Sequence, residues 1–135
     1  MNQIILGLGS NTPNGKETIE AAIQQLSQFC DTLECSAIYP TPAFNAQHAD
    51  TPSYVNCVAQ GETTLSYDEF ILHCKDLEIV LGRTIETRVT NEVPIDIDLI
   101  CFNKSIIRHK EISAPYLQFG FQQLGIHFLT YPFQD

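Results

Sequence analysis

The sequence predicts an α+β fold of the ferredoxin-like type, a βαββαβ antiparallel sheet with two helices packed on one face. First, segments with strand and helix periodicity follow one another in the order β-α-β-β-α-β, which is the split βαβ pattern. Second, the two middle strands are joined by a loop without helical periodicity, which disfavours an open α/β sheet, the other fold considered. Third, 135 residues fit a single domain spanning residues 1–135. The other face of the sheet is expected to be available for loops or a ligand.

The first helix is predicted between two strands. Residues 3–8 alternate as a strand does, and a cluster of turn-forming residues follows them. Residues 16–30 carry apolar side chains at helical spacing, with Asn14 and Glu17 as an N-terminal capping pair. A second strand is expected over residues 33–41, where prolines end it.

The second helix is predicted to follow a third strand. Residues 42–52 are rich in turn-forming types and are expected to be a loop, and residues 54–64 alternate again as a strand. Ser66 and Glu69 form a capping box at the start of the helix, and Gly82 is suited to end it.

Less regular structure is expected in the last third of the chain. Residues 83–92 are predicted to be a polar loop and residues 94–102 the fourth strand. Residues 105–107 could pair back on that strand as a hairpin. Beyond Ile112 the sequence is rich in aromatic residues and has no clear period.

The balance of charges limits the partners that the chain can bind. It has 16 acidic and 7 basic residues and a formal net charge of −9, so polyanions such as DNA and RNA would be repelled. Five of the seven basic residues fall within residues 83–110. An anion would bind there if the chain binds one, and a solvated group of cations is the other interpretation.

The cysteines and the apolar segments indicate a protein of the cytoplasm. The five cysteines are odd in number and include no C-x-x-C pair, so neither a disulfide framework nor a structural zinc site is expected. No apolar segment has the length of a signal or membrane-spanning sequence. We expect no membrane partner, and a monomer or a weak homo-oligomer.

Asp96 and Asp98 are the sharpest local feature of the sequence. Strand residues two apart share a face at a spacing of about 6.6 Å, so the two carboxylates form a pair while the residues alternating with them fill the core. Such a pair suits Mg²⁺, which takes its other ligands from phosphate and water. The alternative is the solvated side of an amphipathic strand, but the apolar Ile100 and Phe102 are expected on the same face.

Tyr54 and Asn56 are expected to share one face of the third strand. A phenol ring beside an amide offers a stacking surface with a hydrogen-bond donor and acceptor, which suits a planar heterocycle, although packing is the commoner role of a strand tyrosine. Gly7 and Gly9 form part of neither a dinucleotide fingerprint nor a phosphate-binding loop. They are expected to let the end of the first strand turn tightly.

Taken together and in order, five motifs resemble those of a known family. They are Gly7-Leu8-Gly9-Ser10-Asn11, Tyr39-Pro40-Thr41-Pro42, Pro52-Ser53-Tyr54-Val55-Asn56-Cys57, Leu77-Glu78 with Gly82-Arg83, and Ile95-Asp96-Ile97-Asp98-Leu99-Ile100. This succession resembles 6-hydroxymethyl-7,8-dihydropterin pyrophosphokinase of folate biosynthesis, and it extends from the start of the chain to about Ala114. The resemblance implies a ferredoxin-like fold and transfer of a pyrophosphoryl group from ATP to the pterin hydroxymethyl group. It also implies Mg²⁺ held by Asp96 and Asp98.

The resemblance further implies which residues bind the two substrates. Thr41, Pro42 and Phe44 would border the pterin, Asn56 would hydrogen-bond its edge, Tyr54 and Phe121 would stack on its ring, and Phe102 would line the same pocket. Near the nucleotide it implies Glu78, Arg83, Arg88, Ile112 and Ser113, with Arg83 also acting in catalysis.

The chain departs from this family at several positions where the family carries basic residues. Thr90-Asn91-Glu92-Val93-Pro94 stands where the family reads Trp-Gly-Pro-Arg-Thr, and Ile85, Tyr116 and Phe119 replace further arginine or histidine residues. Two functional classes therefore stay open. One is an enzyme in which Arg88, Lys104, Arg108 or Lys110 replaces the missing cations. The other is a non-catalytic relative that binds a pterin or another planar ligand.

Overall fold

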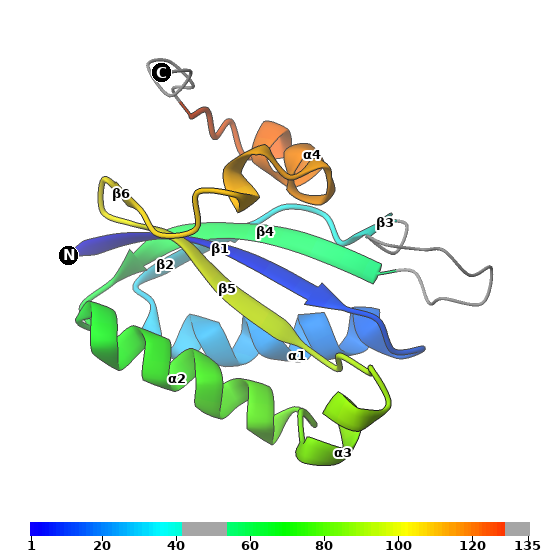
Figure 1. The fold of residues 1–135 in the computed structure, drawn as a ribbon. Coiled ribbons are helices and arrows are strands. Elements are labelled where there is room, and N and C mark those ends of the chain that lie inside the picture. Colours follow the sequence, from blue (N-terminus) through cyan, green and yellow to red (C-terminus); the bar gives the residue numbers. More distant parts are fainter. Residues whose placement is uncertain (42–53, 129–135) are drawn as a thin grey trace.

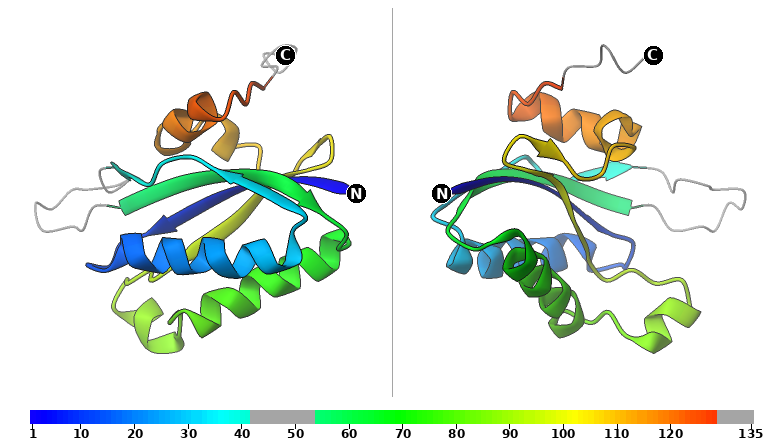
Figure 2. Two further views of the ribbon diagram at one scale, coloured as in Figure 1. Left: turned by 180° about the vertical axis from the view of Figure 1, so that it is seen from behind. Right: turned by 60° about the vertical axis from the view of Figure 1, so that its left-hand side comes forward.

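A six-stranded antiparallel sheet forms the centre of the computed structural model, which describes residues 1–41 and 54–128. The elements, in chain order, are β1 (Asn2–Ser10), α1 (Gly15–Leu26), the 3-10 turn η1 (Ser27–Phe29), β2 (Thr32–Cys35), β3 (Tyr39–Thr41), β4 (Tyr54–Thr63), α2 (Tyr67–Val80), α3 (Ile85–Val89), β5 (Asp96–Phe102), β6 (Ser105–Ile106), the 3-10 turn η2 (Glu111–Ser113) and α4 (Pro115–Gln123). Helices α1 and α2 cover one face of the sheet and α4 lies on the opposite face (Figures 1 and 2). The predicted α+β class is confirmed.

Strand β1 lies in the middle of the sheet. The order of the strands is β2-β4-β1-β5-β6, and β3 also pairs with β4. Strands β2 and β3 replace the single strand that was predicted over residues 33–41. The two strands separate at Ser36. At this point the Val58 N–H of β4 donates its hydrogen bond to the Ser36 hydroxyl, at 2.9 Å, and not to a backbone carbonyl. The predicted hairpin after β5 is confirmed as β6, which pairs with the end of β5.

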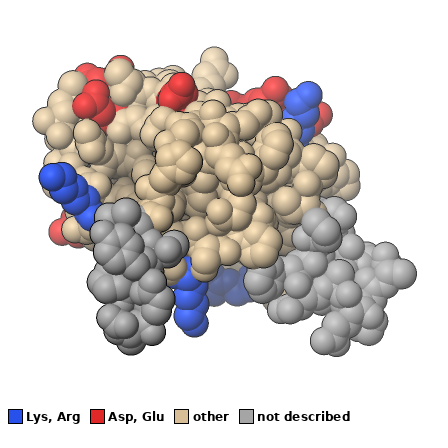
Figure 3. Space-filling model, turned by 90° about the horizontal axis from the view of Figure 1, so that it is seen from above, with Lys and Arg blue, Asp and Glu red and all other residues tan. Residues whose placement is uncertain are grey.

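Two hydrophobic clusters lie on the two faces of the sheet. The larger one packs β1 and β5 against α1 and α2 and includes Leu6 and Phe70, both fully buried. The smaller one packs the other face against α4, through Leu117 and Phe121. Viewed from the α4 side, charged side chains lie around the rim of the molecule and its centre carries none (Figure 3).

Helix α4 was not predicted, because the sequence beyond Ile112 has no clear period. The helix has only nine residues, and its buried side is Leu117, Gly120 and Phe121. Helices this short are marginal on their own and are stabilised by tertiary packing. Gly120 allows a close approach to the sheet, since a Cβ atom there would lie 2.4 Å from Cγ2 of Val58.

A β-bulge in β5 corrects the predicted faces of this strand. Ile5 pairs with Cys101 and Leu6 with Leu99, so the register to β1 shifts by one residue and Ile100 has no partner there. Beyond the bulge the two faces exchange. Phe102 therefore packs on the helix side, with its ring edge-on to Tyr67 at 5.6 Å, and not beside the aspartates as expected.

The ends of the helices are partly as predicted. The capping box of Ser66 and Glu69 is present at the start of α2, and Gly82 follows this helix with a φ of 116°. The expected capping pair of α1 is wrong, because the Asn14 side chain makes no capping hydrogen bond and instead accepts one from the Thr12 hydroxyl. The loop predicted over residues 83–92 contains α3, which has its own capping box at Thr84. Among the described residues, no helix has the length and apolar character needed to cross a membrane.

Candidate functional site

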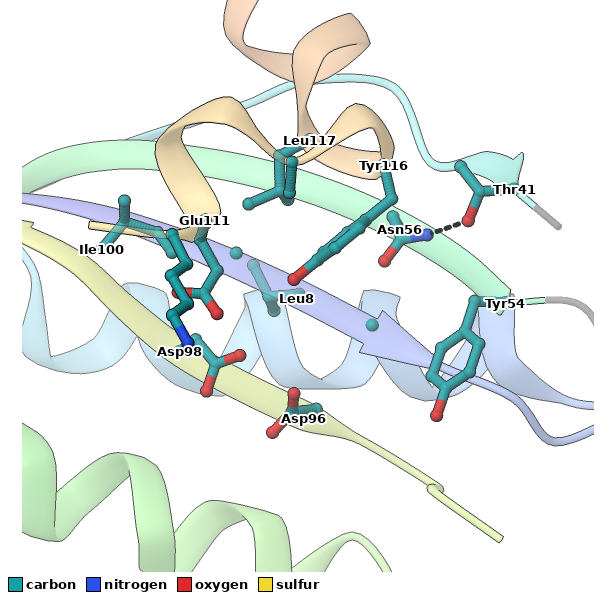
Figure 4. A pocket seen from close by; sticks show the side chains of 14 residues that line it. Leu8, Thr41, Tyr54, Asn56, Asp96, Asp98, Ile100, Glu111, Tyr116 and Leu117 are labelled. Carbon is teal, nitrogen blue, oxygen red and sulfur yellow. Dashed lines mark hydrogen bonds between the residues drawn. The ribbon is translucent and has the colours of Figure 1, made fainter. Parts of the chain in front are cut away.

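A pocket of about 380 Å³ opens on the sheet between the central strands and the segment that leads into α4 (Figure 4). Strands β1, β3, β4 and β5 contribute to it from below, and η2 and α4 from above. Its lining residues are Gly7, Leu8, Gly9, Thr41, Tyr54, Asn56, Asp96, Asp98, Ile100, Lys110, Glu111, Ala114, Tyr116 and Leu117.

The floor of the pocket is the glycine-containing part of β1. Gly7 pairs with Asp98, and Gly9 pairs with Asp96 on one side and Asn56 on the other. A Cβ atom on Gly9 would lie 3.0 Å from Oδ1 of Asn56. The expectation that these glycines turn the end of the strand is wrong. They lie inside the strand, and their missing side chains leave room above it.

Asn56, Thr41 and Tyr54 line one end of the pocket. Asn56 is 4% exposed, and its Nδ2 donates a hydrogen bond to the Thr41 hydroxyl. This bond leaves the Oδ1 atom of the amide on the side of the glycine floor. Burial raises the pKa of the Tyr54 phenol, and the negative charge of Asp96 adds to this effect, so the phenol stays protonated and able to donate.

Tyr116 is the second aromatic side chain of the pocket. In Figure 4 it points from the start of α4 toward the centre of the pocket, which Tyr54 borders at the other end. Phe121, which was expected to stack opposite Tyr54, is 2% exposed in the smaller core cluster and meets Phe128 edge-on. The Tyr39 hydroxyl donates to the carbonyl of Tyr116 at 2.8 Å and fixes the start of α4 above the strands.

Asp96 and Asp98 form the other end of the pocket. Both side chains leave the same face of β5, as predicted, and lie next to each other in Figure 4. Asp96 accepts a hydrogen bond from Nη1 of Arg83 at 3.0 Å, and Nη1 of Arg108 lies 3.7 Å from Oδ1 of Asp98. Burial, followed by the charge of Asp96, raises the pKa of Asp98 to about 7, while the Arg108 charge acts in the opposite direction.

Glu78, a residue of α2, contacts Arg83 from the helix side of β5. It is 4% exposed, and its carboxylate accepts the Ile97 N–H at 2.8 Å and lies 3.4 Å from Nη1 of Arg83. A buried carboxylate with a backbone donor and two cationic neighbours, the second being Lys75 at 3.4 Å, is well satisfied. Glu78 is therefore a positioning residue of Arg83 and does not itself line the pocket.

None of the predicted nucleotide residues lines the pocket, and among them Arg83 contacts a lining residue, Asp96. Arg88 is exposed on α3, and Ile112 packs against the smaller core cluster. Ser113 is exposed, and its hydroxyl donates to the carbonyl of Lys110 at 3.3 Å. Pro42 and Phe44 lie outside the described residues.

Several pocket residues were missed by sequence reasoning. Glu111 was not considered, and Tyr116 was considered only as a replaced family residue; both belong to the segment after β6, where the sequence has no clear period. Lys110, from the same segment, was considered as a replacement cation. The position of Tyr116 directly after Pro115 was the one available signal, because Pro favours the first turn of a helix.

The two aspartates fit a hard cation that keeps other ligands. Within residues 1–41 and 54–128, no group of three or more His, Cys, Asp or Glu side chains could hold a metal ion. Mg²⁺ does not need such a group, because it commonly uses one or two carboxylates and completes its shell with phosphate oxygens and water. The open pocket in front of Asp96 and Asp98 leaves space for those ligands.

Comparisons with known proteins show the family to which the chain belongs. The sequence profile of the 7,8-dihydro-6-hydroxymethylpterin-pyrophosphokinase family matches residues 5–124. The 2-amino-4-hydroxy-6-hydroxymethyldihydropteridine pyrophosphokinase of Aquifex aeolicus is 29% identical over 86% of this chain and 71% of its own length, and that of Haemophilus influenzae is 30% identical over 82% and 69%. A folate synthesis bifunctional protein of Chlamydia muridarum is 34% identical over 86% of this chain, which corresponds to 29% of that protein. The chain thus belongs to the 7,8-dihydro-6-hydroxymethylpterin-pyrophosphokinase family.

Proposed function

We propose that this chain transfers a pyrophosphoryl group from ATP to the hydroxymethyl group of 6-hydroxymethyl-7,8-dihydropterin. One observation carries the proposal: a single pocket joins an end with a buried amide and two tyrosines to an end with two aspartates, each of which has an arginine next to it outside the lining. The first end suits a flat heterocycle and the second suits a polyphosphate with its metal ions. Relatives that bear the pyrophosphokinase name share this sequence over most of its length.

The pterin binds at the amide end. The Oδ1 atom of Asn56 accepts a hydrogen bond from the edge of the pterin ring, while the Thr41 hydroxyl fixes the orientation of the amide. Tyr54 and Tyr116 flank the ring, because they are the two aromatic side chains that border the pocket within the described residues. Tyr116 thus takes the stacking role that the sequence suggested for Phe121. Offset aromatic contacts and one satisfied amide hold a planar ligand at low cost in conformational entropy.

The polyphosphate binds at the aspartate end. Asp96 and Asp98 hold Mg²⁺, which when bound neutralises charge on the phosphate oxygens. Arg83 lies directly beside Asp96 and also contacts Glu78, so its guanidinium is held next to this end of the pocket. Fixed donors of this kind favour charge that develops in the transition state.

The reaction that the pocket supports is a direct displacement. The pterin hydroxyl oxygen forms a bond to the β-phosphorus, the bond from that phosphorus to the bridging oxygen of the α-phosphate breaks, and AMP leaves with the electron pair. The hydroxyl proton passes to water. The protein contributes chiefly by positioning the two substrates and offsetting charge, as is general for phosphoryl transfer.

A second candidate is a non-catalytic pterin-binding protein, and Val93 favours it. The backbone of Val93 is tied to Asn11 by hydrogen bonds of 2.6 and 2.9 Å at the end of β1. Its apolar side chain stands at the position where the family carries an arginine, and it offers no charge to a phosphate. Pterin binding would then persist without turnover.

Release of AMP from ATP and 6-hydroxymethyl-7,8-dihydropterin, measured in the presence of Mg²⁺, tests the proposal. Turnover should be lost in Asp96→Asn and kept in Asp76→Asn, which makes the same chemical change on the exposed face of α2. Pterin binding without AMP release would favour the second candidate. Absence of pterin binding at millimolar ligand would contradict both.

A further inference from the structure

The segment that connects β6 to η2 is fixed to β5 by hydrogen bonds, next to the two aspartates. Ile100, the bulged residue, faces no residue of β1. Its carbonyl instead accepts hydrogen bonds from the N–H groups of Ile107 at 2.7 Å and of Arg108 at 3.3 Å. The bulge therefore anchors this connection, and Arg108 with it, at the aspartate end of the pocket.

Glu111 fixes the direction of the Arg108 guanidinium. The Nε and Nη2 atoms of Arg108 lie 3.2 and 3.4 Å from the two carboxylate oxygens of Glu111, a two-point contact along one edge of the planar group. The third nitrogen, Nη1, is the one that lies 3.7 Å from Asp98. One edge of the guanidinium is thus used to hold the side chain, and Nη1 is left beside Asp98, which lines the pocket.

Each aspartate consequently has an arginine of its own. Arg83, from the end of α2, contacts Asp96, and Arg108, from the other side of the strand, approaches Asp98. Lys110 lines the same pocket. Arg108 is not itself a lining residue, but it approaches Asp98, which is. Arg88 on α3 and Lys104 in the turn after β5, the other two cations that were considered as replacements, neither line the pocket nor form an ion pair with Asp96 or Asp98 within the described residues.

We propose that Arg108 is a phosphate-binding residue of this chain, that Glu111 positions its guanidinium, and that Lys110 adds a second positive charge from the same connection. The inference rests on the proposed function, because the ligand is the polyphosphate of a nucleotide. A cation held by Asp96 and Asp98 would offset the charge of the carboxylate that faces Nη1 of Arg108, and this nitrogen could then donate to a phosphate oxygen. The connection thereby supplies charge that the apolar Val93 lacks.

Calorimetric titration with a non-hydrolysable ATP analogue and Mg²⁺, alongside fluorescence titration with the pterin, tests the inference. Arg108→Gln should weaken binding of the analogue by about tenfold or more, since charge-assisted bonds to phosphate are among the strong ones. Arg108→Lys should restore it only in part, because lysine lacks the planar fork that Glu111 holds. Pterin affinity should be unchanged in both variants. Lys104→Gln, which removes the same charge from the exposed turn, should bind both ligands as the wild type does.

The Glu111→Gln variant distinguishes a role of Glu111 in positioning Arg108 from simple repulsion between its carboxylate and phosphate. If Glu111 positions Arg108, this variant weakens binding of the analogue, and it has no further effect in the Arg108→Gln background. If Glu111 only repels phosphate, the variant strengthens binding, and the positioning role is wrong.

The remaining outcomes distinguish this inference from the proposed function. An Arg108→Gln protein that binds the analogue as tightly as the wild type overturns the inference and leaves the proposed function intact. A wild type that binds both ligands but releases no AMP overturns the proposed function, while the effect of Arg108→Gln on binding still decides the inference. A wild type that binds no nucleotide overturns both.

Discussion

The two ends of the pocket are built in different ways. The amide end is made by paired strands, where Asn56 is 4% exposed and its neighbours are fixed by the register of β1, β3 and β4. At the aspartate end the cations come from connections between elements, and the side chains of Arg83 and Arg108 are 36% and 44% exposed. The shape of the amide end therefore depends on backbone pairing, whereas the charge of the aspartate end depends on long side chains that different positions can supply. A difference of this kind would allow basic residues to be lost at one place and supplied from another without a change in fold.

The largest effect is expected for Asp98, which Arg108 approaches and which we propose as a metal ligand. Asp98→Ala should reduce AMP release by about 10³-fold, because removal of one preorganised charged group commonly costs about 10²- to 10³-fold and this one also holds a cation. Pterin binding should change little, since the amide end is built separately. Steady-state rates and a pterin titration of the same protein check both statements. A parallel loss of pterin affinity would show that the two ends are not independent.

The next largest effect is expected at the amide end. Asn56→Ala should weaken pterin binding by about 1–3 kcal/mol, the usual cost of leaving a buried polar edge unpaired. Binding of a non-hydrolysable ATP analogue should stay the same, as measured by calorimetry. Gln24→Ala, which truncates an exposed amide on α1, serves as the control. An equal loss of affinity for both ligands would mean that the substitution disturbs the fold and does not act through a hydrogen bond to the edge of the pterin.

Helix α4 contributes Tyr116 and Leu117 to the lining of the pocket, and a substitution at Gly120 tests how tightly this helix packs on the sheet. In Gly120→Ala the added Cβ would meet Val58 at 2.4–2.7 Å, so the helix must move away from the sheet. We expect a loss of about 1–3 kcal/mol in the free energy of unfolding, as for other overpacked cores, measured by urea denaturation. Pterin affinity should fall as well because Tyr116 moves with the helix. Gln122→Ala on the exposed side of α4 should leave both quantities unaltered.

The smallest effect concerns salt. Raising the ionic strength from about 0.05 to about 0.5 M shortens the range of electrostatic interactions to a few Å. Binding of the ATP analogue with Mg²⁺ should weaken several-fold, because half-exposed arginines supply the charge at that end, while pterin affinity should stay nearly constant. Titrations in NaCl and in a second monovalent salt check this. A pterin affinity with the same dependence on salt would contradict the contrast drawn between the two ends.

Local patterns in the sequence were sufficient to predict much of the fold. The order of strands and helices, the capping box at Ser66 and the glycine after α2 were predicted because each depends on residues a few positions apart. The shared face of Asp96 and Asp98 was predicted for the same reason, since it follows from the two-residue period of a strand.

Only the tertiary structure decided which other side chains reach the pocket. The bulge at Ile100 depends on how β5 registers with β1, almost a hundred positions earlier in the chain, and it moves Phe102 to the helix side. Helix α4 is too short to be stable by itself and forms against Val58 and its neighbours, which buries Phe121 and turns Tyr116 into the pocket. Periodicity describes one segment at a time. Register and packing arise between distant segments, and they determined which second tyrosine lines the pocket, the glycine floor and the position of Arg108.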